Sequence, residues 1–278
     1  MTTRPVPAPP RPGACGAAPR PVPPGSPPGT ATAARTEGPG VWPAVLPAPR
    51  GNDAGLWLLR LPEALPARHA LDVSVLDATE RRRAASFVHA ADRAGYAAAH
   101  IAVRKVLGAC LGVAPAAVRL RRDPCPCCGG PHGRPTRLAD PPPYFSLAHG
   151  GGVVLIGVAR VPVGVAAERP PAPSALPAVS GVLSLAERAE VSAAAPERRA
   201  EVFARLWAGR RALRRARGDG AGTHGAHGWQ VTGLPVDDLW LAVAVRRTAD
   251  APEGRVTLHH LDQRGVFTPA APPGGSAW

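Results

Sequence analysis

The sequence predicts an α+β fold made of two similar halves. Helical periodicity followed by short strand patterns, each bounded by Gly or Pro, occurs in residues 53–161 and again in residues 162–268. Helices that precede strands able to pair antiparallel are typical of the α+β class, in which helices cover one face of a sheet. We therefore expect two halves that join near Val161–Ala167.

The first half opens with the apolar strand pattern LWLLRL at Leu56–Leu61. Asp77 and Glu80 supply N-cap chemistry for a helical run to about Val88. Apolar residues at spacings of three, four and seven then predict a long helix with one buried face over Asp92–Leu111. The remaining apolar runs of this half predict short strands at Val118–Arg121, Tyr144–His149 and Val153–Val158.

The second half repeats the succession, beginning with a strand at Val163–Ala167. Two helices are expected next, followed by three strands; the ranges are Leu185–Ala194, Glu197–Arg217, Trp229–Thr232, Leu239–Val245 and Val256–Leu261. Residues 1–52 are rich in Pro and are expected to form a disordered tail, because they cannot bury enough apolar surface to offset the entropy of ordering. Residues 269–278 are expected to be flexible as well, and Gly218–Gly228 to form a loop.

The net charge of +13 would ordinarily indicate a polyanion as partner. Lys105 is the one Lys, however, and Arg is enriched together with Ala, Pro and Gly, as a GC-rich coding sequence would produce. We interpret the charge as coding bias and expect no nucleic-acid partner. No apolar run is long enough to cross a bilayer and no signal-peptide order is present, so we expect a cytoplasmic protein without a membrane partner.

The five cysteines do not form an evident disulfide framework, because their number is odd and three are crowded together. Such usage fits a reducing compartment. Cys125 and Cys128 form one CxxC pair, and His132 follows. These three residues could form part of a zinc site, or a turn that carries free thiols, and the sequence leaves both interpretations open.

Three stretches occur in a fixed order: YFSLAHGG at 144–151, PVGVAAE at 162–168 and LWAGRRALRRARGDG at 206–220. With the helix at 87–113 and the HGRP turn at 132–135, they resemble the motifs of the two-halved, surfactin-synthetase-activating type of 4′-phosphopantetheinyl transferase. The resemblance covers about residues 56–247. It implies a pseudo-dimer of two α/β halves in one chain, with a monomer as the default.

The resemblance also implies an activity, the transfer of phosphopantetheine from coenzyme A to a Ser of an acyl or peptidyl carrier protein. Members of this family hold Mg²⁺ with an Asp and a Glu of G-x-D-x-E and a Glu of the following helix. Glu168 matches the second carboxylate, and we expect it to be catalytic and the one remaining metal ligand. Ala166 stands in place of the Asp, and Arg211 in place of the helix Glu. We expect Arg211 to be catalytic as well, because it could supply a cation in place of the metal, but it cannot act as a base.

Further residues match positions that contact coenzyme A in the family. His149 matches the motif His, Arg134 of HGRP matches a basic residue that meets the phosphates, and Arg215 matches the final motif Lys. Arg82 and Arg83 resemble basic residues near the nucleotide; a solvated helix face is the alternative interpretation. Gly95 stands where an Arg for the 3′-phosphate is usual.

Two functions therefore remain open. The chain is either a transferase with reduced activity, or a catalytically inactive relative that binds coenzyme A or a carrier protein. Arg210, Arg211, Arg214 and Arg215 place like charges at helical spacing, which predicts an anionic group nearby.

Overall fold

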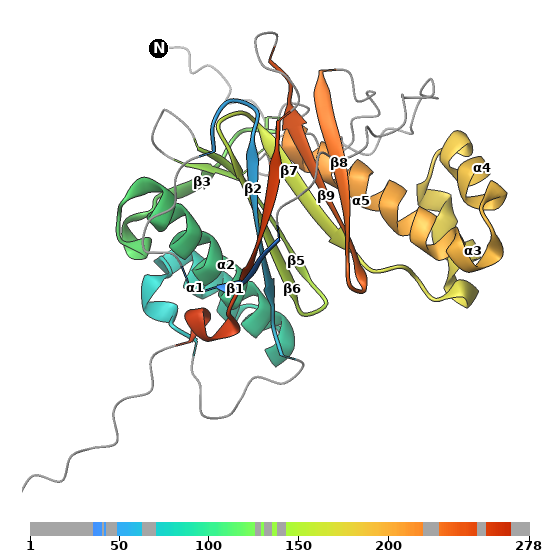
Figure 1. Cartoon of the computed structure of the whole chain (residues 1–278). Coiled ribbons are helices and arrows are strands. Elements are labelled where there is room, and N and C mark those ends of the chain that lie inside the picture. Colours follow the sequence, from blue (N-terminus) through green and yellow to red (C-terminus); the bar gives the residue numbers. More distant parts are fainter. Residues whose placement is uncertain are drawn as a thin grey trace, which may run out of the picture.

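The computed structural model describes residues 36–40, 42, 49–62, 71–125, 129–130, 135–137, 143–218, 228–248 and 254–267. These residues confirm the α+β class. Two sheets lie face to face in the middle of the molecule, with helices on the outer face of each (Figure 1). Apolar clusters fill the three interfaces of these four layers: helices with the first sheet, sheet with sheet, and the second sheet with its helix.

The first sheet has five strands in the order β1-β10-β2-β6-β5. The bounds are β1 Thr36–Gly40, β2 Ala54–Arg60, β5 Tyr144–Gly150, β6 Val153–Ala159 and β10 Val256–Leu261. β2, β6 and β5 pair antiparallel, whereas β10 runs parallel to both of its neighbours. A separate pair is formed by β3 Leu120–Arg122 and β4 Pro135–Arg137.

Helices α1 Ala78–Ala85 and α2 Ala90–Leu111 cover the outer face of the first sheet (Figure 1). The predicted cap of α1 is confirmed, because Asp77 accepts from the backbone N–H of Glu80 while Glu80 accepts from that of Asp77. α2 ends at Gly112, whose φ of 67° is the left-handed conformation that favours glycine. Its apolar face is buried against the sheet, as the periodicity predicts.

The second sheet has the order β7-β9-β8 and is antiparallel throughout. Its strands are β7 Val163–Glu168, β8 Trp229–Val236 and β9 Leu239–Arg246. Helix α5, Arg199–Arg217, packs on the outer face, and α3 Leu176–Val179 and α4 Leu185–Ala193 pack against α5.

The contact between α5 and the second sheet is made by small residues. It consists of the buried side chains Ala166, Ala208, Ala212, Ala216, Ala242 and Ala244. Gly164 of β7 allows the closest approach, because a Cβ at this position would lie 2.1 Å from the backbone oxygen of Ala212. The separation between β7 and α5 is therefore fixed by backbone atoms, which matters for every side chain that reaches from one element to the other.

Two expectations about the chain ends need correction. β1 lies within residues 1–52, where a disordered tail was expected, and Thr36, Glu37 and Gly40 of this strand pair with β10. β10 was expected in the second half, yet it inserts between β1 and β2 of the first sheet. Most of residues 1–52, the loop after Gly218 and the tail 269–278 lie outside the described residues. In the described part of the chain, no helix has the length and apolar character needed to span a membrane.

Candidate functional site

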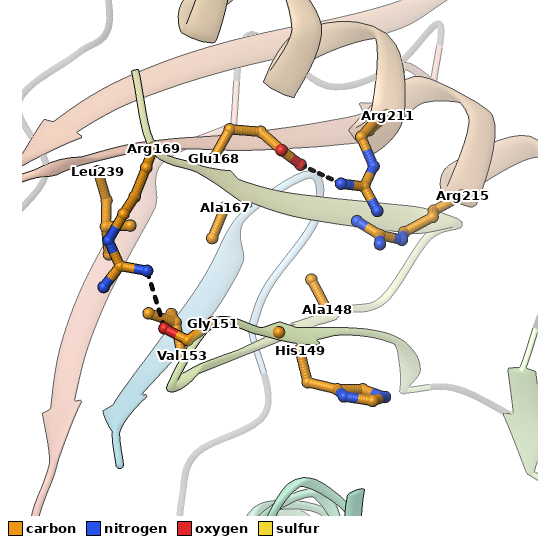
Figure 2. A pocket seen from close by; sticks show the side chains of 11 residues that line it. Ala148, His149, Gly151, Val153, Ala167, Glu168, Arg169, Arg211, Arg215 and Leu239 are labelled. Atoms are coloured by element: carbon orange, nitrogen blue, oxygen red, sulfur yellow. Dashed lines mark hydrogen bonds and ion pairs between the residues drawn. The ribbon is translucent and has the colours of Figure 1, made fainter. Parts of the chain in front are cut away.

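One open pocket lies where the two halves meet, between the β5–β6 turn, the end of β7 and the side of α5 from which Arg211 and Arg215 reach toward β7 (Figure 2). Its volume is about 220 Å³. Charged and small residues dominate the lining, which consists of Ala148, His149, Gly150, Gly151, Val153, Ala167, Glu168, Arg169, Arg211, Arg215 and Leu239. The turn Gly150–Gly152 has positive φ at all three positions, so it brings bare backbone to the pocket wall.

Glu168 and Arg211 form an ion pair across the pocket wall, with Nη1 of Arg211 donating to Oε1 of Glu168 at 2.5 Å (Figure 2). Burial raises the pKa of Glu168, although the charge of Arg211 and its hydrogen bond act in the opposite direction. The guanidinium carbon of Arg211 lies 6.0 Å from the ring centroid of Trp207, at the outer limit of a cation–π contact. The structure thus joins the two residues expected to be catalytic.

Arg215 lies one helical turn beyond Arg211 and also points toward the pocket (Figure 2). Its Nη1 donates to the backbone oxygen of Val165 at 2.8 Å, and the N–H of Val165 donates to the hydroxyl of Ser146 at 3.1 Å. The backbone oxygen and N–H of Val165 are available for these bonds because β7 is an edge strand of its sheet. Burial, together with the nearby charge of Arg211, lowers the pKa of Arg215 to about 10, so the guanidinium remains charged at neutral pH.

Ala166 is completely buried in the alanine layer beneath α5. It lies on the same face of β7 as Glu168, because alternate residues of a strand point the same way. The position to which the resemblance assigns a second metal ligand is therefore occupied by a methyl group packed against the helix.

The residues present do not fit a Mg²⁺ ion. Mg²⁺ needs hard oxygen ligands in near-octahedral geometry. Glu168 is the one carboxylate in the pocket lining, and one of its two oxygens, Oε1, already accepts from Arg211. A guanidinium at this distance would oppose a divalent cation by Coulomb repulsion. Nor do the described residues contain a group of three or more His, Cys, Asp or Glu side chains able to hold a metal.

His149 reaches the pocket with its backbone, but its ring points away from Glu168 and Arg211 (Figure 2). The ring lies toward α2, with its centroid 6.2 Å from that of Tyr96 in an edge-on arrangement. Partial burial and the nearby charges of His100 and Arg215 lower the pKa of His149, which favours the neutral imidazole.

Other residues predicted from the sequence do not line the pocket. Arg82 and Arg83 are exposed on α1, where Arg83 lies over the ring of Phe87 with 5.1 Å between its guanidinium carbon and the centroid. Gly95 lies in α2. Arg134 lies outside the described residues, and so do Cys128 and His132 of the proposed zinc corner, whereas Cys125 is buried.

Sequence reasoning missed a chain of charges beside the pocket. Arg169 donates to Asp238 at 2.6 Å and to the backbone oxygen of Gly151 at 2.8 Å. Asp238 also accepts from Arg60 at 2.9 Å, and Arg60 donates to Asp237 at 3.0 Å. We call this series of ion pairs, formed by Arg60, Arg169, Asp237 and Asp238, the charged clasp. It joins both halves, and the one sequence signal for it is the Asp pair in the turn between β8 and β9.

No model of a known protein family matches this chain, and no match is found among curated proteins.

Proposed function

We propose that this chain belongs to the 4′-phosphopantetheinyl transferase superfamily and transfers phosphopantetheine from coenzyme A to a Ser of an acyl or peptidyl carrier protein at a reduced rate. The observation that carries the proposal is that three separate motifs meet at one pocket between the halves, which is lined by the side chains of Glu168, Arg211 and Arg215 and by the backbone of His149. The sequence resemblance requires this convergence, although the residues lie far apart in the chain.

The topology supports the two-halved pseudo-dimer that belongs to this proposal. In each half a strand, a long covering helix and two further strands follow one another, as β2-α2-β5-β6 and as β7-α5-β8-β9. In both, the first strand pairs with the third, and the third with the second. A shared strand order with antiparallel pairing throughout is what an internal repeat would produce. Because both halves are in one chain, a monomer can complete the pocket.

The transfer requires a Ser hydroxyl to attack the phosphorus that carries the pantetheine. The bond to adenosine 3′,5′-bisphosphate breaks, and the hydroxyl proton must be accepted. Guanidinium groups of Arg211 and Arg215 are suited to stabilise charge on the phosphoryl oxygens. Glu168 is the candidate base, since it is the one carboxylate of the lining and burial raises its pKa. Its bond to Arg211 weakens it in this role and is our reason to expect a low rate.

A second function is favoured by the same ion pair and by the burial of Ala166. If Glu168 stays bound to Arg211, general-base catalysis is lost, which costs on the order of 10²–10⁴ in rate. The protein would then bind coenzyme A or a carrier protein without turnover. In either case a carrier with an acidic surface suits the Arg-rich side of α5.

Mass spectrometry of an apo carrier protein incubated with this protein and coenzyme A tests the proposal. A phosphopantetheine mass increment that grows with time, and more slowly with the Glu168→Gln variant, is expected for the transferase. If no mass increment forms but calorimetry still detects coenzyme A binding, the second function is supported, a protein that binds without turnover. Absence of both transfer and binding contradicts both functions.

A further inference from the structure

The pocket has an excess of positive charge that a metal site would not tolerate. Three guanidinium groups, those of Arg169, Arg211 and Arg215, line the pocket together with one carboxylate, so the formal charge of the lining is +2. Arg169 is held by Asp238 in the charged clasp. The excess is therefore concentrated on α5, where Arg211 and Arg215 are i,i+4 neighbours.

Both α5 arginines are oriented by fixed partners and keep further donors. Each guanidinium has five N–H groups in a planar fork. Among the described residues, Arg211 uses Nη1 on Glu168 and Arg215 uses Nη1 on the oxygen of Val165. Since these contacts use only one edge of each fork, the remaining N–H groups can bind oxygen atoms in the pocket. Phosphate oxygens match this bidentate geometry.

Desolvation makes Arg215 a stronger partner for an anion. Arg215 is largely removed from water, and its charge lies beside that of Arg211, which is why its pKa is depressed. Like charges held together in a partly dry site attract a multivalent anion more strongly than exposed arginines do. The spacing of about 5–6 Å between i,i+4 side chains lets each fork take a different phosphate group of one ligand.

We propose that this pocket binds a diphosphate group without a divalent metal, with Arg211 and Arg215 of α5 as the cations. The proposal rests on the proposed function for its most specific ligand, the diphosphate of coenzyme A, but inorganic diphosphate or a nucleoside diphosphate has the same chemistry. Glu168 competes with the ligand for Arg211. The carboxylate therefore opposes binding here, whereas in a metal site it would be required.

Calorimetric titration with inorganic diphosphate, ADP and coenzyme A, in excess Mg²⁺ and in excess EDTA, tests this inference. We expect inorganic diphosphate to bind in EDTA and to bind no more tightly in Mg²⁺, because no metal takes part in the site and Mg²⁺ in solution competes for the free diphosphate. Stronger binding of coenzyme A than of the other two would identify the diphosphate of coenzyme A as the ligand; equal binding would make it a general diphosphate site.

Variants distinguish diphosphate binding by the arginines of α5 from diphosphate binding through a metal ion. Glu168→Gln should tighten diphosphate binding by about threefold or more, because it frees Arg211 and removes a negative charge. Arg211→Ala should weaken it by about tenfold. Arg214→Ala is the matched control, because Arg214 lies on the same helix but does not line the pocket, and it should leave Kd nearly unchanged. Circular dichroism of each variant establishes that it is folded.

Binding that needs Mg²⁺, or that Glu168→Gln abolishes, would overturn the inference, and so would no binding of any of the three ligands. The outcome is separate from that of the proposed function. Metal-independent diphosphate binding without transfer to a carrier protein would keep this inference and remove the transferase. Transfer that a chelator abolishes would keep the transferase and remove this inference.

Discussion

Gly164→Ala tests whether the close contact between β7 and α5 holds the pocket together. The added Cβ would lie 2.1 Å from the backbone oxygen of Ala212 and 2.2 Å from the backbone nitrogen of Ala216, where contacts are normally no shorter than about 3.4 Å. Backbone atoms cannot rotate away, so the helix must move outward by roughly 1 Å. Overpacking of this kind costs about 1–3 kcal/mol, and we expect the upper end.

For a domain of this size, 1 kcal/mol shifts Tm by roughly 2–4 °C, so Gly164→Ala should lower Tm by about 6–12 °C in calorimetry. It should also change the Kd of diphosphate, because α5 carries Arg211 and Arg215 away from Glu168 and the Val165 oxygen, their partners on β7. Gly209→Ala is the control on the same helix. Its Cβ would meet Val231 at 3.6 Å, an ordinary contact, and Ala gains up to about 1 kcal/mol over Gly in a helix.

We therefore expect Gly209→Ala to melt at or slightly above the wild-type temperature with unchanged diphosphate affinity. If Gly164→Ala melted within about 1 °C of the wild type, the helix would not be held at the distance described here. Backbone contact between β7 and α5 would then not set the geometry of the ion pair between Glu168 and Arg211.

Three further predictions concern charged groups. Glu80→Gln removes the charge that pairs with the buried Arg104 at 2.7 Å, and because Asp77 still pairs with Arg104 at 2.9 Å, the change should lower the free energy of unfolding by about 1.5–3 kcal/mol at neutral pH. Burial raises the pKa of Glu80, but bonds to His100, the Asp77 backbone and Arg104 lower it, and the net shift is downward. The contribution of Glu80 to stability is therefore present above its unfolded pKa and lost as pH falls through its folded pKa. Urea unfolding from pH 7 downward should show the unfolding free energies of the variant and the wild type converging. Arg211→Glu sets two carboxylates face to face and should make Tm rise on addition of Mg²⁺, an effect absent from the wild type. Asp238→Asn weakens the charged clasp and should lower Tm slightly at low salt, with the difference vanishing at high salt, as melting curves at the two ionic strengths would show.

The local elements could be predicted because their signals are local. The spacing of apolar residues along α2, the Asp77–Glu80 cap and the apolar runs of β6 and β9 each act within a few residues, and all are confirmed. The positions of β1 and β10 could not be predicted in this way. Parallel pairing between strands that lie about 200 residues apart depends on the shape of the finished sheet, and Pro in β1 made a tail the better interpretation.

The site, too, could be predicted in part: the motifs predicted which residues meet, but not the bonds between them. The motifs identified Glu168, Arg211 and Arg215 as neighbours, and the structure brings them into one pocket. Their direct bond could not be predicted, because it depends on the distance between β7 and α5. The outward ring of His149 follows from strand alternation, since Ala148 points into the interface between the sheets and its neighbour must point the other way. The charged clasp draws on three separate loops and strand ends, so no local pattern could predict it.

The insertion of β10 between β1 and β2 has a consequence for synthesis on the ribosome. The first sheet cannot be completed until Val256–Leu261 has emerged, although its neighbour β2 is made among the first residues. At about 5–20 residues per second, the roughly 200 residues between them take about 10–40 s. During this time the edge of β2 has no partner strand, so the nascent chain offers an open strand edge to chaperones. A fragment that stops before Val256 would never close it.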